Sequence, residues 1–437
     1  MQSFITEQCN HLSVHAMPTR KYVNRYLHLG IVNEQGRIPP VVFAVIVQLL
    51  FKVSSGTAGN GQLQQHLWSM YADEIRCELE HKGETQLASI RLHLPADVLP
   101  RAEARTHDAL KLLAEMLFGL GDKGGFDFNE AQIQEEITWA EHHAGYDVSE
   151  WDKVVRGRCL EWMGYAGRAR NDELEQLHRS VRDGELQQWY REVLRCPLHI
   201  HVIGDFQPDV MIAQVMNIFL PSVVKAEEGV IPPVMGNDRP AEHREEGEMM
   251  LELMDVQQCK INVAFTTGVT YTSSDYPALF LFHSLYGATP ASRLQYELRE
   301  RKQWVYQIYS TLDDYRGTLH VTTGTSSGYV TDVLEAIDAE WLRICSGDIT
   351  EAELNRAIQN VMHYVQVGYD LPEQVVTLHM DRLLNHVQMT TPQFLEAISG
   401  VTSEHVAEVA SGMKKAVTWI MYPESEYSVS VQEVNHE

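Results

Sequence analysis

Two histidines, two residues apart, are the first candidates for chemistry in this 437-residue sequence. His199 and His201 lie in an alternating apolar segment, so on a β-strand their imidazoles would share one face and could bind a metal ion together. A third histidine or a carboxylate would have to join them from elsewhere in the chain. Because the sequence does not identify such a ligand, structural roles are the preferred interpretation of this pair.

The other potential metal ligands do not form a recognisable site. His142 and His143 follow Glu141 in a helical segment, where adjacent residues point in different directions, so we interpret them as part of a solvated helix face. The six cysteines contain no C-x-x-C pair, which argues against a zinc knuckle or a disulfide framework and favours reduced, packed thiols. They are Cys9, Cys77, Cys159, Cys196, Cys259 and Cys345.

Composition describes a globular, acidic protein. Hydrophobic residues make up 44% of the chain, and the formal charge of -25 would repel a phosphate backbone, so nucleic acid is not an expected partner. We interpret the acidity as a solubilising exterior rather than as a chamber for basic peptides. Residues 1–11 lack the apolar core of a signal peptide, and the apolar run Val41–Phe51 is shorter than the roughly 18 residues of a membrane span. We therefore expect a cytoplasmic protein without a membrane partner.

The segments that would form the secondary structure around any site occur twice along the chain. Several short segments recur in the same order at a slowly drifting offset, which indicates an internal duplication. The composition of the segment 221–247, with its prolines and acidic residues, is that of a linker. We therefore predict an N-terminal domain at 1–220, a linker at 221–247 and a C-terminal domain at 248–437. The matching segments are Leu63–Leu67 with Leu294–Leu298, Glu130–Ile133 with Glu351–Leu354, and Gly145–Asp147 with Gly368–Asp370.

Each copy is predicted to be an α+β unit, a mainly antiparallel sheet covered by helices. Alternation and β-branching predict strands, and long apolar runs predict helices. In the second copy, Asp275 and Pro277 mark a helix start and Gly287 its expected end. The predicted strands are Gln86–Leu94, His199–Ile203 and Thr318–Thr323, and the predicted apolar helices are Val41–Phe51 and Ala278–Tyr286.

This plan resembles the pitrilysin/insulinase family, in the bacterial two-domain form that is similar to mitochondrial processing peptidase. The resemblance implies that the chain is half of a clamshell that closes around a peptide chamber. It covers nearly the whole chain apart from the linker and the termini. The segments that carry it are Tyr286–Leu294, Leu298–Glu300 and Trp304–Tyr306, supported by His199–Asp205, Gly347–Leu354 and Pro18–Tyr22.

The signature of that family, H-x-x-E-H on the first helix, is missing from this sequence. In the family the two histidines bind zinc and the glutamate acts as general base. Aligned on this chain, the histidine positions fall on Ala44 and Gln48 and the glutamate position on Val47. The resemblance therefore implies a degenerate zinc motif, no catalytic residue and no cofactor in this chain, with zinc held by a homologous H-x-x-E-H partner subunit.

The resemblance also implies a role for Arg299 and Tyr306, which match the family pair that contacts the substrate or stabilises the developing oxyanion. In an arbitrary sequence the same spacing would indicate a surface arginine and a core tyrosine. The implied function is the non-catalytic, substrate-binding subunit of a heterodimeric zinc metallopeptidase that cleaves peptides, with peptide natural product maturation as its setting. The alternative is a structural or peptide-binding scaffold of the same fold. An active zinc enzyme with a different ligand set is disfavoured, because no ligand cluster has helical spacing.

Overall fold

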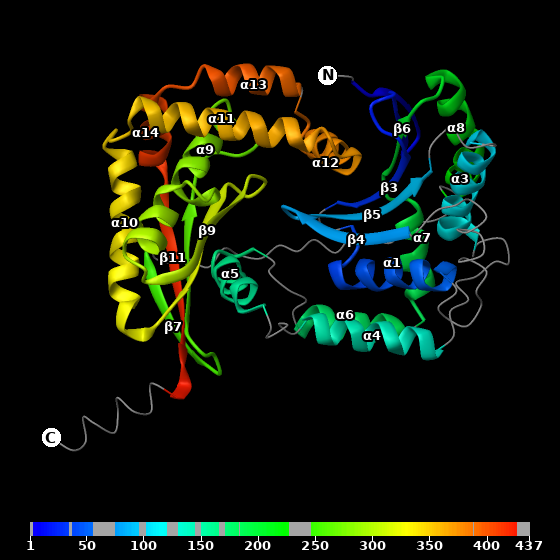
Figure 1. The fold of residues 1–437 in the computed structure, drawn as a ribbon. Coiled ribbons are helices and arrows are strands. Elements are labelled where there is room, and N and C mark those ends of the chain that lie inside the picture. Colours follow the sequence, from blue (N-terminus) through cyan, green and yellow to red (C-terminus); the bar gives the residue numbers. More distant parts are fainter. Residues whose placement is uncertain are drawn as a thin grey trace. The chain divides into compact units, whose positions relative to one another are not determined.

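The computed structural model consists of two compact units (Figure 1). Unit 1 comprises Met1–Gly145, Ala169–Arg239 and Asp370–Thr377, and unit 2 comprises Tyr146–Arg168, Pro240–Tyr369 and Leu378–Glu437. The structure describes residues 3–34, 37–55, 75–95, 102–119, 130–144, 150–165, 171–182, 184–226, 246–387 and 389–425.

Unit 1 is built on a six-stranded mixed sheet. Its strands are β1 (Ile5–Cys9), β2 (Leu12–Pro18), β3 (Arg25–Asn33), β4 (Ile75–Lys82), β5 (Thr85–Leu94) and β6 (Leu198–Gly204). They are ordered β1-β2-β6-β3-β5-β4, with β2 and β6 parallel and the other neighbours antiparallel. The strands predicted at 86–94 and 199–203 are confirmed as β5 and β6.

Helices cover one face of this sheet and enclose the core of unit 1. They are α1 (Pro40–Ser55), α3 (Ala102–Phe118), α4 (Glu130–Ala144), α6 (Asn171–Arg182), α7 (Leu186–Leu194) and α8 (Pro208–Ala226). α1 is apolar around most of its circumference because α3, α4, α6 and α7 all pack against it. On β3, Leu27 and Leu29 point into this core, so Tyr26 and His28 point to the opposite face of the sheet.

Among the described helices, α8 alone is long and apolar enough to satisfy the criteria for a membrane span. Met211, Val215 and Phe219 recur along it at helical spacing and are buried in the core of unit 1. This is the pattern of a helix that packs one face against a sheet.

Unit 2 repeats the sheet of unit 1 without the first strand. Its strands are β7 (Glu248–Met254), β8 (Cys259–Thr266), β9 (Val305–Asp313), β10 (Thr318–Thr325) and β11 (Lys414–Pro423). Their order, β7-β11-β8-β10-β9, matches β2-β6-β3-β5-β4 strand for strand, including the one parallel pair. The predicted α+β fold class, with two sheets covered by helices, is confirmed, and the shared order is what a duplication predicts.

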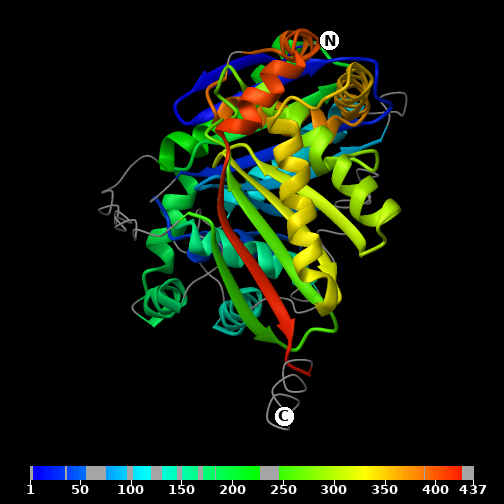
Figure 2. The ribbon, with the colours of Figure 1, turned by 90° about the vertical axis from the view of Figure 1, so that its left-hand side faces the viewer.

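Helices lie on both faces of the sheet in unit 2. One layer contains α9 (Tyr276–His283), α10 (Val330–Cys345), α11 (Glu351–Gly368), α13 (Thr391–Ser399) and α14 (Ser403–Gly412), and α10 runs along the strands (Figure 2). α5 (Trp151–Trp162), from the first half of the chain, covers the other face. There Val155 packs with Met421, and Cys159 with Val417. α12 (Pro372–Leu384) belongs in part to each unit.

The helix predicted from Asp275 begins there, with Pro277 in its first turn, but it does not end at Gly287. α9 passes directly into the π-helical segment η3 (Ser284–Ala288), which contains Gly287. A Cβ atom on Gly287 would lie 2.7 Å from the Oγ of Ser310 on β9. Glycine is therefore required by the close approach of helix and strand rather than by a helix end.

Parts of the sequence predictions concern residues outside the described chain. The segments Leu63–Leu67 and Gly145–Asp147 of the internal repeat are among them, as is most of the linker predicted at 221–247. Residues 221–226 of that linker form the last turns of α8. The repeat segments that begin at Glu130 and Glu351 are described, and these residues begin α4 and α11.

Candidate functional site

The helix at which the family motif would lie offers no metal ligand. Ala44 and Gln48 are one turn apart on α1 and partly exposed, whereas Val47 is buried in the core. An aliphatic methyl group and a carboxamide cannot replace two imidazoles as zinc ligands, and the valine cannot accept a proton. The residues present at these positions therefore do not fit a catalytic zinc ion.

Arg299 lies in η4 (Gln295–Arg301), a second π-helical segment in unit 2. Its side chain is 46% exposed, and its guanidinium lies 3.7 Å from the carboxylate of Glu300, measured from Nε to Oε1. Leu298, next to it, is fully buried and anchors the segment to the core. Arg299 is thus an exposed cation on an anchored backbone, in a helical geometry that is frequent at functional sites.

A buried ion cluster fixes the residues that lead into η4. Arg293, only 9% exposed, lies 3.1 Å from a carboxylate oxygen of Glu353 and also hydrogen-bonds to the carbonyl of Asp348. Glu353 is at the same time the N3 residue of a capping box with Thr350 at the start of α11. The arginine of the S-R-L motif is therefore a positioning residue that ties the start of η4 to the start of α11.

Tyr306 is on β9, an edge strand of the sheet in unit 2, and its side chain is 86% exposed. Val305 and Ile308 on the same strand are buried, so the strand itself is firmly packed. Within the described part of the chain, no hydrogen bond to the Tyr306 hydroxyl and no direct bond between Arg299 and Tyr306 is formed. The interpretation of Tyr306 as a core residue is excluded, and both members of the predicted pair are available to a ligand.

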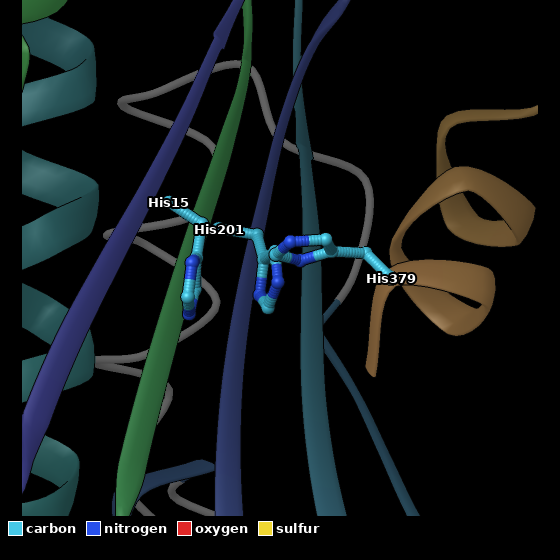
Figure 3. A group of neighbouring side chains, drawn as sticks. All are labelled: His15, His201 and His379. Carbon is cyan, nitrogen blue, oxygen red and sulfur yellow. The ribbon is translucent and has the colours of Figure 1, made fainter. Parts of the chain in front are cut away.

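His199 and His201 share one face of β6, as predicted, and two histidines of neighbouring strands join them. His15 on β2 and His201 stack with ring centroids 4.4 Å apart (Figure 3), and Nε2 of His15 is 3.1 Å from Nδ1 of His199. Nδ1 of His28 on β3 is 3.2 Å from Nδ1 of His201. The third side chain drawn in Figure 3, His379, is on the part of α12 that belongs to unit 2.

This histidine row, His15, His28, His199 and His201, consists of two hydrogen-bonded pairs that stack on each other through His15 and His201. Each N···N contact needs one proton between the two nitrogens, so one ring donates and the other accepts. Burial lowers the pKa of His28 to about 3, with a smaller contribution from Arg91, and burial lowers the pKa of His199 to about 4. Sequence analysis missed His15 and His28 because neither strand order nor register is visible in the sequence. The side chains of the other predicted pair, His142 and His143, lie outside the described residues.

Comparisons with known proteins find similar sequences and similar folds. Residues 185–361 match the family described as Peptidase M16 inactive domain. A Bacillus subtilis (strain 168) protein named probable inactive metalloprotease YmfF is 22% identical over 422 residues, covering 94% of this chain and 95% of its own length. A conserved protein from Enterococcus faecalis V583 is similar in structure with a TM-score of 0.77 at 19% identity, covering 97% of this chain and 99% of that chain. A protease from Helicobacter pylori has a TM-score of 0.73 at 14% identity, covering 97% and 100%.

Proposed function

The chain belongs to the peptidase M16 (pitrilysin) family as an inactive homologue, and from this premise we propose that it is the non-catalytic, substrate-binding subunit of a heterodimeric zinc metallopeptidase. In this proposal a homologous H-x-x-E-H chain supplies the zinc, its ligands and the general base. This chain supplies Arg299 and Tyr306, which bind the peptide backbone or the developing oxyanion. The substrates are peptides, and the pair works in the cytoplasm.

The observation that carries the proposal is the exposure of Arg299 and Tyr306 on firmly packed elements. A tyrosine that is 86% exposed on an edge strand contributes little to the stability of its own domain. Its hydroxyl and the guanidinium of Arg299 are hydrogen-bond donors that can stabilise negative charge on a carbonyl oxygen. At the same time α1 contains no histidine, cysteine, aspartate or glutamate that could bind zinc or act as its general base.

Co-expression with an H-x-x-E-H homologue from the same genome tests the proposal. We expect the two chains to co-elute in size-exclusion chromatography and to cleave an unfolded peptide that neither chain cleaves alone. The matched control is the same pair with the glutamate of the partner motif replaced by glutamine, which should co-elute without cleaving. Failure to bind or activate any such homologue would contradict the proposal and favour a scaffold of the same fold.

Two further parts of the proposal have their own measurements. Cell fractionation of a tagged chain tests the cytoplasmic location, and recovery in the membrane or external fraction would contradict it.

Peptide natural product maturation is the setting we propose for the cleavage. Deletion of the coding sequence should then leave an uncleaved precursor peptide, detectable by mass spectrometry, and an unchanged peptide profile would argue against that setting.

A further inference from the structure

Unit 2 contains a cavity of about 190 Å³ that no step of the proposed function uses. It is enclosed by α9, α11, α13 and the part of α12 in this unit, with Asp314 from the turn between β9 and β10. Tyr364, which is 66% exposed, also lines it. The volume is far larger than the space one water molecule needs, so a small organic group can enter.

The apolar part of this cavity is a cluster of aromatic rings. Tyr276 is central, with its ring centroid 4.9 Å from that of Tyr271 and 5.8 Å from those of Phe280 and Phe394. Phe280 and Phe394 in turn lie edge to face at 5.8 Å. Aromatic faces carry partial negative charge and attract a cation that lies within about 6 Å of the ring centroid.

The polar part of the cavity carries two carboxylates and one guanidinium. Asp314 accepts a hydrogen bond of 2.8 Å from the Tyr276 hydroxyl, and Asp381 accepts one of 2.6 Å from the hydroxyl of Tyr315. Arg382, the cationic group of the lining, is hydrogen-bonded to Thr391 at the start of α13. Two negative charges against one positive charge leave the lining with an excess of negative charge.

Burial raises the pKa of the Asp314 carboxyl, and the neighbouring Asp381 raises it further against the lowering effect of the Tyr276 hydroxyl. A ligand with a positive charge would relieve this repulsion, whereas an anion would increase it. The overall charge of -25 also favours the approach of cations. Charge and aromatic lining therefore select the same kind of ligand.

We propose that this cavity is a binding site for an organic cation, an ammonium or guanidinium group carried on an apolar stem. The stem lies against Phe280 and Phe394, and the charged group faces Asp314 and Asp381. The inference does not depend on the peptidase partnership, because every lining residue belongs to unit 2.

Calorimetric titration of the full chain with benzylammonium chloride tests the proposal, with benzyl alcohol as the neutral ligand of similar shape. We expect saturable binding of the ammonium at least about tenfold tighter than binding of the alcohol. Parallel titration with N-acetyl-lysine methylamide distinguishes a peptide-borne cation from a free amine, and saturable binding of either cation at least about tenfold tighter than that of benzyl alcohol supports the proposal. The proposal would be overturned if neither cation binds saturably, or if neither binds more tightly than benzyl alcohol.

Variants locate the site. Asp314→Asn and Asp381→Asn each remove one charge at nearly constant shape, and each should weaken cation binding about tenfold. Asp332→Asn, at an exposed position of α10 outside the cavity, is the matched control and should bind like the wild type. Thermal unfolding of each variant shows whether it is folded, and the second aspartate variant keeps the test decisive if one of them is not. Unchanged affinity in a folded Asp314 or Asp381 variant would exclude this cavity as the site.

Discussion

Exposed tyrosines on packed edge strands have few roles inside their own domain. The Tyr306 ring gains little burial, and the hydroxyl has no hydrogen-bond partner in the described part of the chain. Arg299 is in a comparable position on η4, with the carboxylate of the neighbouring Glu300 3.7 Å from its guanidinium. At both positions the side chain can be changed with little effect on folding, so effects on stability and on activity can be measured separately.

Replacing Arg299 with Ala, or Tyr306 with Phe, should lower peptide turnover by the reconstituted pair. A donor removed from an oxyanion site costs about 10²–10³ in rate, whereas an exposed substitution changes the free energy of unfolding by about 0.5 kcal/mol or less. Cleavage kinetics and thermal melts of the same preparations check both values. Tyr296→Phe, which alters a tyrosine that is 62% exposed on the same segment, serves as the control. Wild-type turnover by both variants would show that the pair has no role in cleavage.

Sequence reasoning could select these residues but could not describe their surroundings. The spacing of Arg299 and Tyr306 matched a family pattern, yet the same spacing also fitted a core tyrosine. Exposure of Tyr306 follows from the position of β9 at the edge of the sheet, which depends on long-range strand pairing. The role of Gly287 was likewise hidden, because the Ser310 side chain that it accommodates comes from a different element.

At the scale of secondary structure elements, three adjacent strands determine the properties of the histidine row. β2, β6 and β3 place His15, His201 and His28 opposite one another in register. Because the core face of the same strands is aliphatic, these histidines occupy the face of the sheet opposite the one that α1 and α8 cover. Burial then keeps His28 and His199 neutral in the folded chain.

The histidine row should make unit 1 less stable towards unfolding at acidic pH. A histidine whose pKa falls from about 6.5 when unfolded to about 3 or about 4 when folded binds more protons in the unfolded chain. Its contribution to stability is complete above about pH 6.5. The contribution is lost as the pH falls from about 6.5 to the pKa of the folded state, about 3 for His28 and about 4 for His199. At pH 5 the loss should be about 2 kcal/mol for each of the two histidines.

Urea unfolding at pH 7.5 and pH 5.0 checks this expectation. His28→Gln should remove about 2 kcal/mol of the difference between the two pH values, even if it lowers stability at both. His363→Gln, at an exposed position of α11, is the control and should keep the wild-type difference. A His28→Gln chain with the full wild-type difference would show that the row does not carry the pH dependence.

Most elements could be predicted because their patterns are local. Alternation identified β5, β6 and β10, and an unbroken apolar run identified α1, since a helix surrounded by other helices has no polar face. The position of α5 could not be predicted in this way. Its residues precede α6 in the chain, but Val155 and Cys159 pack on the sheet of unit 2. Nothing in its own sequence specifies which of two similar sheets it covers.

At the scale of the whole molecule, the duplicated fold and the zinc motif depend on different residues. Two sheets with the same strand order are formed by copies that share only short matching segments, because the order depends on hydrophobic pattern and connection more than on particular residues. The zinc motif depends on two histidines and one glutamate, so its loss from α1 leaves the fold intact. A chain can therefore lack the catalytic residues and still keep the fold.

The missing zinc motif predicts that this chain does not bind zinc. The purified chain should contain well below one zinc ion per molecule after desalting with a mild chelator, because Ala44, Val47 and Gln48 offer no ligand set. Chelation of the reconstituted pair should abolish cleavage, yet leave the melting temperature of this chain, measured alone, unchanged. Elemental analysis and thermal melts with and without chelator check the two statements.

A zinc content near one per chain that resists mild chelation would contradict the prediction, and the histidine row would then be the first place to look for ligands. Zinc would have to replace the proton that each N···N contact holds, so binding would compete with acid and weaken as the pH falls. Replacing His199 and His201 together with Ala would remove a ligand from each contact, and loss of the metal from that variant would assign the zinc to β6. If the wild-type chain contains no zinc and the pair loses activity on chelation, the metal belongs to the partner, as the proposed division of labour requires.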